Sequence, residues 1–441
     1  MNVSESRLEA QDLNKQGELL LKAGNLTQAE SKFQAAIDVD PMVMDSYKNY
    51  GDLCMAKEDY KEAKNYYKKA ILVEKNGQLY FLYGNACFMN DEMHEGLEYY
   101  NMAISEGYDT DEMLFFMGMA YEHMNDYQVA YRYFQKAYAK NPSRPDYLVK
   151  KIGALVKLDM IDEAEESTDE LLSTAPEYFD GYHIKIQLLI HKKDYVEAIK
   201  FAEAATARFP EDVDLVLDLV RSCAMNQEFD RAIALIENAK KMKYFEESKR
   251  AFTILEAEIF AEKNDYDSAM KCCNECIAME DEDNYAGEAR FMLMNLYLAK
   301  PDYALACDIA TQLVQADKED VYYFAALYYK AFCNKHLGND EEAARLFKEA
   351  NSIYRLETLK KPAAVDIYLY RVMCLKDLEQ YDKALELLEF IEGLSDKIAE
   401  VYTLRADIYN KMGRKSLADE NLEKAYKLKP ELKPSNESVG E

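Results

Sequence analysis

The sequence predicts an all-α protein built from about twelve helix–turn–helix repeats. Three observations support this fold class. Only 15 Gly and 9 Pro occur among 441 residues, so residues that interrupt helices are scarce. A small residue recurs at intervals close to 34 positions over nearly the whole chain. A short polar turn precedes it in most repeats, and such internal periodicity is typical of stacked pairs of helices.

The recurring small residue marks the expected point of closest approach within each repeat. The twelve positions are Ala29, Ala63, Gly96, Ala130, Ala164, Ala198, Ala232, Ala269, Ala306, Ala343, Ala384 and Ala418. The interval is 33 or 34 residues up to Ala232 and at the last step, but 37 to 41 residues between Ala232 and Ala384. Two antiparallel helices approach closely only where a side chain is nearly absent, so we expect these residues to be buried.

Polar and rigid residues predict where the second helix of each repeat begins and ends. Aspartate accepts hydrogen bonds from the free N–H groups at a helix start. The predicted caps are Asp59, Asp126, Asp194, Asp265 and Asp302. Proline lacks an N–H group and clashes with the preceding turn. The predicted stops are Pro41, Pro142, Pro176, Pro210 and Pro430. Ser6 and Glu9 have the spacing of a capping box for the first helix.

These repeats resemble the tetratricopeptide repeat (TPR) family, whose 34-residue pattern combines a glycine, small residues and aromatics. The family glycine is matched by Gly17, Gly51, Gly84 and Gly118. The later aromatic is matched by Phe33, Tyr67, Tyr100, Phe134 and Phe347. The resemblance covers nearly the whole chain and implies a right-handed α-solenoid superhelix of about twelve repeats. Ile152 and Ile186 replace the glycine in two repeats, where we expect slightly wider helix spacing.

The repeat intervals suggest how the chain is organised. Residues 1–9 are expected to lead into the first repeat, and residues 10–249 to form seven repeats with a pitch of 34 residues. Residues 250–430 are expected to form five repeats of longer pitch that continue the first arm, and residues 431–441 a disordered tail.

The charge balance excludes some classes of partner. Asp and Glu number 82 against 54 Lys and Arg, which gives a net charge of −28. Such a chain repels phosphate backbones, so we do not expect it to bind nucleic acid. Its apolar stretches are shorter than the ~20 residues of a membrane span. The N-terminus lacks the apolar core of a signal peptide, and nine unpatterned cysteines suit a reducing cytoplasm.

A cysteine-rich stretch, "KCCNECIAMEDED" at 271–283, raises the question of a metal or redox site. By their repeat positions, Cys273 and Cys276 should face the core between the helices, and Cys272 should point elsewhere. No second C-x-x-C is present, although tetrahedral zinc needs four ligands. His183 and His191 lie on one helix face and could hold a metal, but nothing near them supports it. We therefore predict no metal, cofactor or catalytic site, and no enzymatic activity.

The family resemblance implies that first helices line a concave groove. The predicted partner-binding residues in the N-terminal half are Phe81, Asn85, Phe88, Phe115 and Met119. Those in the C-terminal half are Phe291, Asn295, Tyr328, Phe332, Leu369 and Met373. Large apolar residues in a groove indicate partner contact. The alternative is that these side chains cover one another. Lys48 matches a family carboxylate clamp, but Asp52 and Glu112 depart from it.

Acidic residues outnumber basic ones along the predicted groove. The acids are Asp52, Glu122, Glu258, Glu262, Asp377 and Asp407. The bases are Lys48, Lys157, Arg221, Lys335 and Lys376. The resulting field favours segments that combine basic and apolar residues.

The sequence thus predicts a cytoplasmic, non-enzymatic scaffold or adaptor that binds peptide or protein segments in its groove. One alternative is a structural protein that assembles into a homo-oligomer. Another is an enzyme that depends on a metal or a thiol. The sequence leaves the oligomeric state open.

Overall fold

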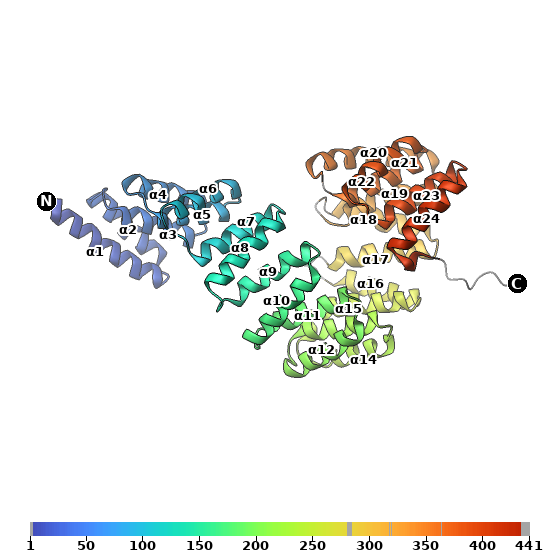
Figure 1. Ribbon diagram of the computed structural model, residues 1–441, viewed down its shortest axis with the longest axis horizontal. Helices are drawn as coiled ribbons and strands as arrows, with labels where there is room; N and C mark the ends of the chain where they lie inside the picture. The colour runs from blue at the N-terminus through green and yellow to red at the C-terminus, as the bar shows by residue number, and fades with distance from the viewer. Residues whose placement is uncertain (1–2, 280–284, 317, 319, 363, 434–441) are drawn as a thin grey trace. The chain divides into compact units, whose positions relative to one another are not determined.

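A computed structural model describes residues 3–279, 285–316, 318, 320–362 and 364–433 of the chain. The described residues form 24 α-helices and one short 3-10 helix, Pro430–Leu432 (Figure 1). This confirms the predicted all-α fold, because 24 helices correspond to twelve pairs. The tail predicted at 431–441 lies outside the described residues from 434 onward.

The chain divides into two compact units, Met1–Asp218 and Leu219–Glu441. The helices of the first unit are α1 (Val3–Lys22), α2 (Leu26–Val39), α3 (Met44–Ala56), α4 (Tyr60–Val73), α5 (Gly77–Met89), α6 (Met93–Ser105), α7 (Asp111–His123), α8 (Tyr127–Lys140), α9 (Pro145–Lys157), α10 (Ile161–Thr174), α11 (Phe179–His191) and α12 (Tyr195–Arg208). The boundary lies inside α13 (Val213–Met225). The helices of the second unit are α14 (Phe229–Ala239), α15 (Phe245–Glu262), α16 (Tyr266–Ala278), α17 (Tyr285–Ala299), α18 (Tyr303–Ala316), α19 (Tyr323–His336), α20 (Asp340–Lys360), α21 (Val365–Asp377), α22 (Tyr381–Leu394), α23 (Ala399–Lys411) and α24 (Lys415–Leu428).

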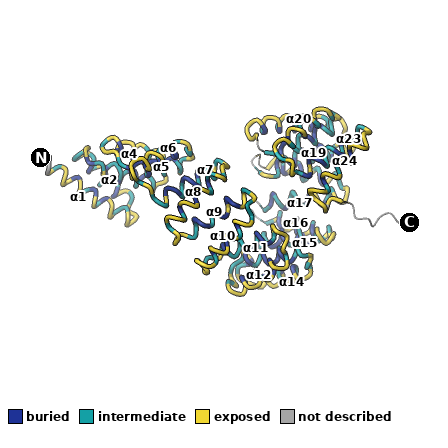
Figure 2. The backbone as a smooth tube through the Cα atoms, in the orientation of Figure 1, coloured by how far each residue is buried: buried dark blue, intermediate teal, exposed yellow. Residues whose placement is uncertain are grey.

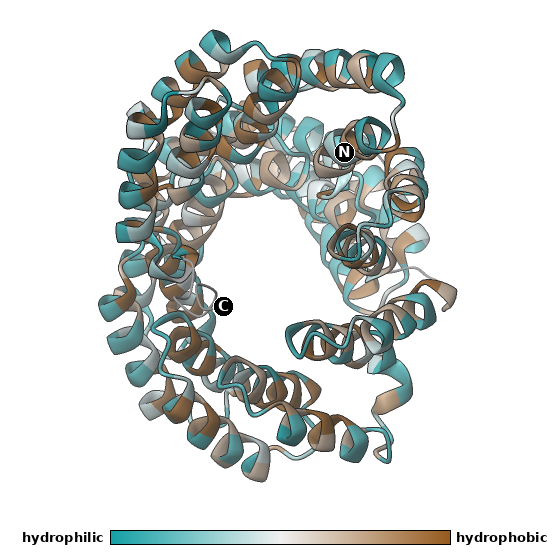
Figure 3. Cartoon of the chain, turned by 90° about the vertical axis from the view of Figure 1, so that its right-hand side faces the viewer, coloured by the Kyte–Doolittle hydropathy of each residue, from teal (hydrophilic) through white to brown (hydrophobic). Residues whose placement is uncertain are grey.

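From α1 to α12 and again from α14 to α24, every helix packs on the next one along the chain. First helices of neighbouring repeats also touch, as α15 and α17 do, and as α19, α21 and α23 do in succession. Buried and exposed residues alternate along the helices (Figure 2), and hydrophobic and hydrophilic residues also alternate along them (Figure 3). In these places the first helices pack side by side, and the groove residues were predicted on first helices.

The small residue at the centre of each repeat is buried, as predicted. The eleven alanines are at most 2% exposed, and Gly96 is also buried. The family glycine packs against the aromatic of the next helix: a Cβ on Gly17 would lie 2.4 Å from the Phe33 ring, and one on Gly51 would lie 2.5 Å from the Tyr67 ring. These distances are too short for any side chain, so the ring requires glycine opposite it.

In two repeats without the glycine, the first helix carries the larger side chain and the second helix the smaller one. Ile152 and Ile186 are both buried. The residues that replace the aromatic in the same repeats are the smaller Thr168 and Ala202, which are also buried. A large side chain has moved from the second helix to the first, so the sequence compensates for the lost glycine. This exchange was not anticipated when wider helix spacing was predicted.

The additional residues of the longer repeats extend helices. The second helix α20 has 21 residues, whereas α18 and α22 have 14 each. The first helix α15 has 18 residues, whereas α13 has 13. Extra pitch in these repeats therefore appears as helix length in α15 and α20.

The predicted caps and stops agree with the structure. Each predicted aspartate accepts a hydrogen bond from the N–H three residues later, as Asp59 does from Glu62 at 3.1 Å. All five helices followed by a predicted stop end two residues before the proline. The capping box was wrong, because α1 begins at Val3 and already contains Ser6. Among the described residues, no helix combines the length and apolarity that crossing a membrane requires.

Candidate partner-binding pockets on the first helices

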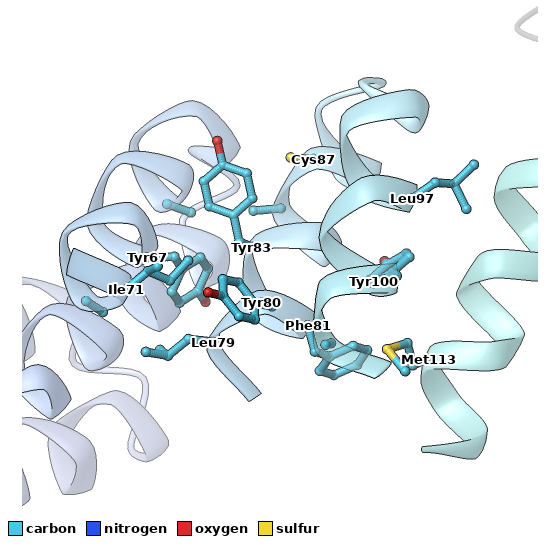
Figure 4. Packing of buried hydrophobic residues seen from close by; sticks show 14 of the residues in the cluster. Tyr67, Ile71, Leu79, Tyr80, Phe81, Tyr83, Cys87, Leu97, Tyr100 and Met113 are labelled. Carbon is cyan, nitrogen blue, oxygen red and sulfur yellow. The ribbon is translucent and has the colours of Figure 1, made fainter. Parts of the chain in front are cut away.

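The predicted N-terminal patch is mostly a packed aromatic cluster. Phe81 on α5 is only 5% exposed, and its ring lies 5.6 Å from that of Tyr108 and 6.0 Å from that of Tyr100. Figure 4 shows it pointing toward Tyr100 and Met113. The expectation that this ring faces a partner is therefore corrected, because it fills the space between α5, α6 and α7.

The other members of this patch are half-buried and cover one another. Phe88 lies 5.7 Å from the ring of Phe116, and Phe115 lies 4.8 Å from that of Tyr147. The Tyr100 hydroxyl donates a 2.7 Å hydrogen bond to Asn85 Oδ1. Met119 packs beside Phe115 in the same region. The arrangement matches the alternative in which the groove aromatics pack against each other.

The members of the predicted C-terminal patch differ in their burial. Tyr328 on α19 is 2% exposed and belongs to the core, which corrects its prediction as an open groove residue. Phe332 is half-buried against His336, at 4.4 Å, and Phe291 stacks on Tyr322 at 4.7 Å. Asn295 is exposed on α17. Large aromatics of this patch therefore serve mainly to pack neighbouring helices.

Leu369 and Met373 line a pocket of about 300 Å³, here called the Leu369 pocket. First helices alone form it. Its lining consists of Tyr329 from α19, Asp366, Leu369, Tyr370 and Met373 from α21, and Glu400, Thr403 and Leu404 from α23. The pocket combines an apolar floor with two carboxylates at helix starts. The Lys429 ammonium pairs with Glu400 at 2.5 Å and lowers the pKa of that carboxyl.

A second pocket, of about 690 Å³, opens beside α15 and is here called the Glu258 pocket. Its apolar lining comprises Ala224, Met225, Phe229, Leu255, Ile259, Ala261 and Met292. Its polar lining comprises Arg221, Gln227, Glu258 and Glu262. The three charged residues were predicted in the groove, whereas its apolar lining was not. Those side chains come from three helices besides α15, so no single repeat indicates that they converge.

Ion pairing separates the predicted groove acids into two groups. Four of them pair with a lysine: Asp52 with Lys48 (2.8 Å), Glu122 with Lys150 (2.8 Å), Asp377 with Lys335 (3.1 Å) and Asp407 with Lys376 (2.7 Å). Within the described part of the chain, Glu258 and Glu262 make no ion pair and no side-chain hydrogen bond. Both of these unpaired acids line the Glu258 pocket.

The surroundings of Glu258 disfavour its charged form. Burial raises the pKa of the Glu258 carboxyl, Arg221 opposes this shift, and Glu288 and Glu262 add to it. Burial likewise raises the pKa of Glu288 on α17. A half-buried carboxylate without a direct partner gains most from a cation that enters the pocket.

The cysteine-rich stretch belongs to the core. Cys273 and Cys276 are 0% exposed, as predicted. Cys272 was expected to point elsewhere, but it is also buried, at 9% exposed. Burial raises the pKa of Cys273 to about 12 and that of Cys272 to about 11, which keeps both thiols protonated. Residues 280–283 of this stretch lie outside the described residues.

Two other groups offer possible metal ligands. Cys87, Glu92 and Glu95 bring their ligand atoms within 4.8 Å of one another, but the Lys64 ammonium already contacts both carboxylates. His183 Nδ1 lies 2.5 Å from Oδ2 of the buried Asp218, an acid that the sequence analysis did not connect with it. His191 is exposed. These contacts assign Lys64 and His183 to local ion-pair and hydrogen-bond networks.

Comparisons with known proteins agree with the repeat pattern. Family models of the tetratricopeptide repeat match residues 14–74, 111–143, 189–246 and 399–432. A solved tetratricopeptide repeat protein from Parabacteroides merdae is 18% identical, with a TM-score of 0.41 over 65% of this chain and 99% of its own. The APC/C hetero-tetramer Cut9-Hcn1 gives 13% identity and a TM-score of 0.40 over 98% and 96%. YrrB, described as a TPR protein with an unusual peptide-binding site, gives 18% and 0.37 over 42% and 95%. No curated protein matches the chain.

Proposed function

Because the chain is a tetratricopeptide repeat protein, we propose that it is a non-enzymatic scaffold that binds peptide or protein segments on its first helices. Repeat solenoids offer extended surfaces of this kind to partners. The observation that carries the proposal is the pair of pockets in the second unit, because both combine apolar floors with carboxylates. An extended segment places alternate side chains into such pockets.

The two kinds of lining have different roles in this proposal. Apolar side chains such as Leu369 and Met373 supply most of the affinity, since desolvated contacts dominate binding energy. The acidic side chains attract basic segments and accelerate encounter, an effect that weakens as salt rises. We therefore expect ligands in which apolar residues are flanked by Lys or Arg.

We place this scaffold in the cytoplasm. All nine cysteines are free thiols, and eight of them are buried. Free thiols persist in reducing compartments, whereas exported proteins usually pair them.

A second candidate function is self-association. Leu356 and Leu359, in the C-terminal part of the long helix α20, are 63% and 73% exposed. Exposed leucines on one helix favour contact with another apolar surface. Sedimentation of the wild type and of a Leu356→Ala, Leu359→Ala variant distinguishes the two functions. Self-association through these leucines predicts a wild-type oligomer that the variant loses, whereas a monomeric scaffold predicts that both proteins sediment as monomers.

Selection from a displayed library of random short peptides tests the proposed function. Selected peptides should be enriched in apolar and basic residues and should bind the purified protein in fluorescence anisotropy. The double change Leu369→Ala, Met373→Ala should lower the affinity of peptides that use the Leu369 pocket by about tenfold or more, roughly 1.4 kcal/mol. The Leu356→Ala, Leu359→Ala variant is the matched control and should bind as the wild type does. Failure to select any peptide that the pocket variants weaken would contradict the proposal.

A further inference from the structure

The Glu258 pocket differs from the Leu369 pocket in the state of its acids. Its volume of about 690 Å³ is in the range of ligand-binding sites. Glu258 is half-buried and, within the described residues, makes no ion pair or side-chain hydrogen bond. Burial of such a charge is unfavourable unless a cation compensates it. In the free pocket, the negative charge of Glu258 therefore lacks a directly bound cation to stabilise it.

The charged groups around Glu258 leave the pocket negative. Arg221 on α13 and Glu262 on the same helix as Glu258 line the pocket with it, and Glu288 on α17 lies near enough to act on its charge. Two carboxylates and one guanidinium therefore line the pocket, and a third carboxylate acts on it from α17. The pocket therefore has a place for one additional positive charge.

The walls identify what kind of cation fits. Met225, Phe229, Leu255, Ile259 and Met292 supply an apolar surface beside the carboxylates. A small hydrated ion would leave this surface exposed to water. Lysine and arginine have long apolar stems with the charge at the tip, so they cover such walls and reach the acid at the same time.

From this combination we infer that the Glu258 pocket binds the side chain of a lysine or arginine in the partner segment. The stem lies along Leu255 and Ile259, and the ammonium or guanidinium group donates hydrogen bonds to the Glu258 carboxylate. Glu262, at the exposed end of the helix, attracts the charge on approach. The inference rests on the proposed function and specifies the chemistry of one of its contacts.

The bound state should depend on pH in a defined direction. A cation binds the ionised carboxylate, and burial raises the pKa of Glu258 above its ordinary value. Affinity should therefore be highest above that pKa and should fall as the pH drops through it. Conversely, binding of the cation lowers the pKa of Glu258 and releases a proton where the free carboxyl is still protonated.

A small probe tests the pocket without a known partner. n-Butylguanidinium has the stem and head of arginine, and n-butylurea has nearly the same shape without the charge. Methyl NMR of Met225 and Met292, which both line the pocket, reports binding of each probe. We expect n-butylguanidinium to shift both methyl signals and n-butylurea to shift them far less. Equal shifts with the two probes would overturn the inference.

Charge-neutral variants assign the contact. Glu258→Gln should weaken the binding of n-butylguanidinium by at least about fivefold and should reduce its pH dependence, which Glu262 and Glu288 then carry alone. Glu246→Gln changes the same charge on an exposed position of α15 outside the pocket, and it should bind as the wild type does. Glu262→Gln provides a second test if Glu258→Gln unfolds. Probe binding that neither pocket variant weakens, or stronger methyl shifts with Mg²⁺ than with the probe, would also reject a side-chain pocket.

The same variants separate this inference from the proposed function. Peptides selected by the wild type can be resynthesised with norleucine in place of lysine, which keeps the stem and removes the charge. If peptides bind but neither this change nor Glu258→Gln weakens them, the inference fails while the scaffold stands. If n-butylguanidinium binds as expected but no peptide is ever selected, the proposed function fails while the pocket chemistry stands.

Discussion

Tyr328 on α19 donates a 2.8 Å hydrogen bond through its hydroxyl to Oδ2 of Asp377 on α21. Asp377 also pairs with Lys335 at 3.1 Å. The bond joins the first helices of two successive repeats, and the tyrosine is 2% exposed. Burial and the nearby carboxylate raise the pKa of Tyr328 above its ordinary value. A ring predicted to meet a partner thus holds the repeats together.

Tyr328→Phe should destabilise the fold without affecting binding. The change removes one donor from the buried Asp377 carboxylate, so the free energy of unfolding should fall by about 1.5–3 kcal/mol. Urea denaturation measures this change, and anisotropy should show unchanged affinity for selected peptides. Tyr127→Phe is the control, because its hydroxyl bonds to Asn125 at an exposed site. A large loss of peptide affinity at wild-type stability would show instead that Tyr328 contacts the peptide.

Two glycine substitutions should have opposite effects on the stability of the fold. A Cβ on Gly51 would lie 2.5 Å from the Tyr67 ring, whereas one on Gly153 in α9 has no atom within 4 Å. Gly51→Ala should therefore destabilise, by about 1–3 kcal/mol as overpacking does. Gly153→Ala should stabilise α9 by about 0.5–1 kcal/mol. Thermal melting compares the two variants, and equal signs would show that the glycine and the aromatic do not pack as described.

Ala198 tests the closest contact between helices in one repeat. Ala198→Leu should cost about 1–3 kcal/mol, because the added side chain has no space. Ala198 is 0% exposed, whereas Ala204 on the same helix α12 is exposed. Ala204→Leu makes the same substitution at the surface and should be nearly neutral. Hydrogen exchange should also show loosening of the adjoining repeats with Ala198→Leu, since solenoid stability is shared between neighbours.

Cys273 should react slowly in the folded protein. It is 0% exposed and burial raises its pKa to about 12, so thiolate is scarce and inaccessible. Cys307 is less buried and should alkylate faster. Mass spectrometry of a time course with a thiol reagent gives both rates. One zinc ion per chain, lost on Cys273→Ser, would instead show that the C-x-x-C binds metal.

Local patterns in this sequence were sufficient to predict the helix pair of each repeat. The alanine at the centre of each pair, the aspartate before the second helix and the proline after it act within one repeat of the chain. A ring such as Tyr67 requires glycine at Gly51, and both positions can be read from a single repeat. The exchange of bulk at Ile152 and Thr168 is also visible in the sequence once the pairing of positions is known.

Whether a first-helix side chain is buried or accessible to a partner does not follow from its own repeat. Tyr328 and Leu369 have equivalent positions in successive repeats, yet one is buried and the other lines a pocket. Glu258 and Asp377 are both groove acids, yet among the described residues only Asp377 forms an ion pair with a lysine. Each outcome depends on residues supplied by neighbouring repeats, 30 to 50 positions away along the chain, and on how their side chains divide the space.

By itself the sequence determined the helices, their pairing and the acidic character of the first-helix surface, because periodicity, caps and small residues act over short separations. The tertiary structure alone decided which aromatics close the core and which carboxylates stay unpaired. The physical reason is that burial and ion pairing are properties of three-dimensional neighbourhoods. The Glu258 pocket exists only where side chains of α13, α14, α15 and α17 converge.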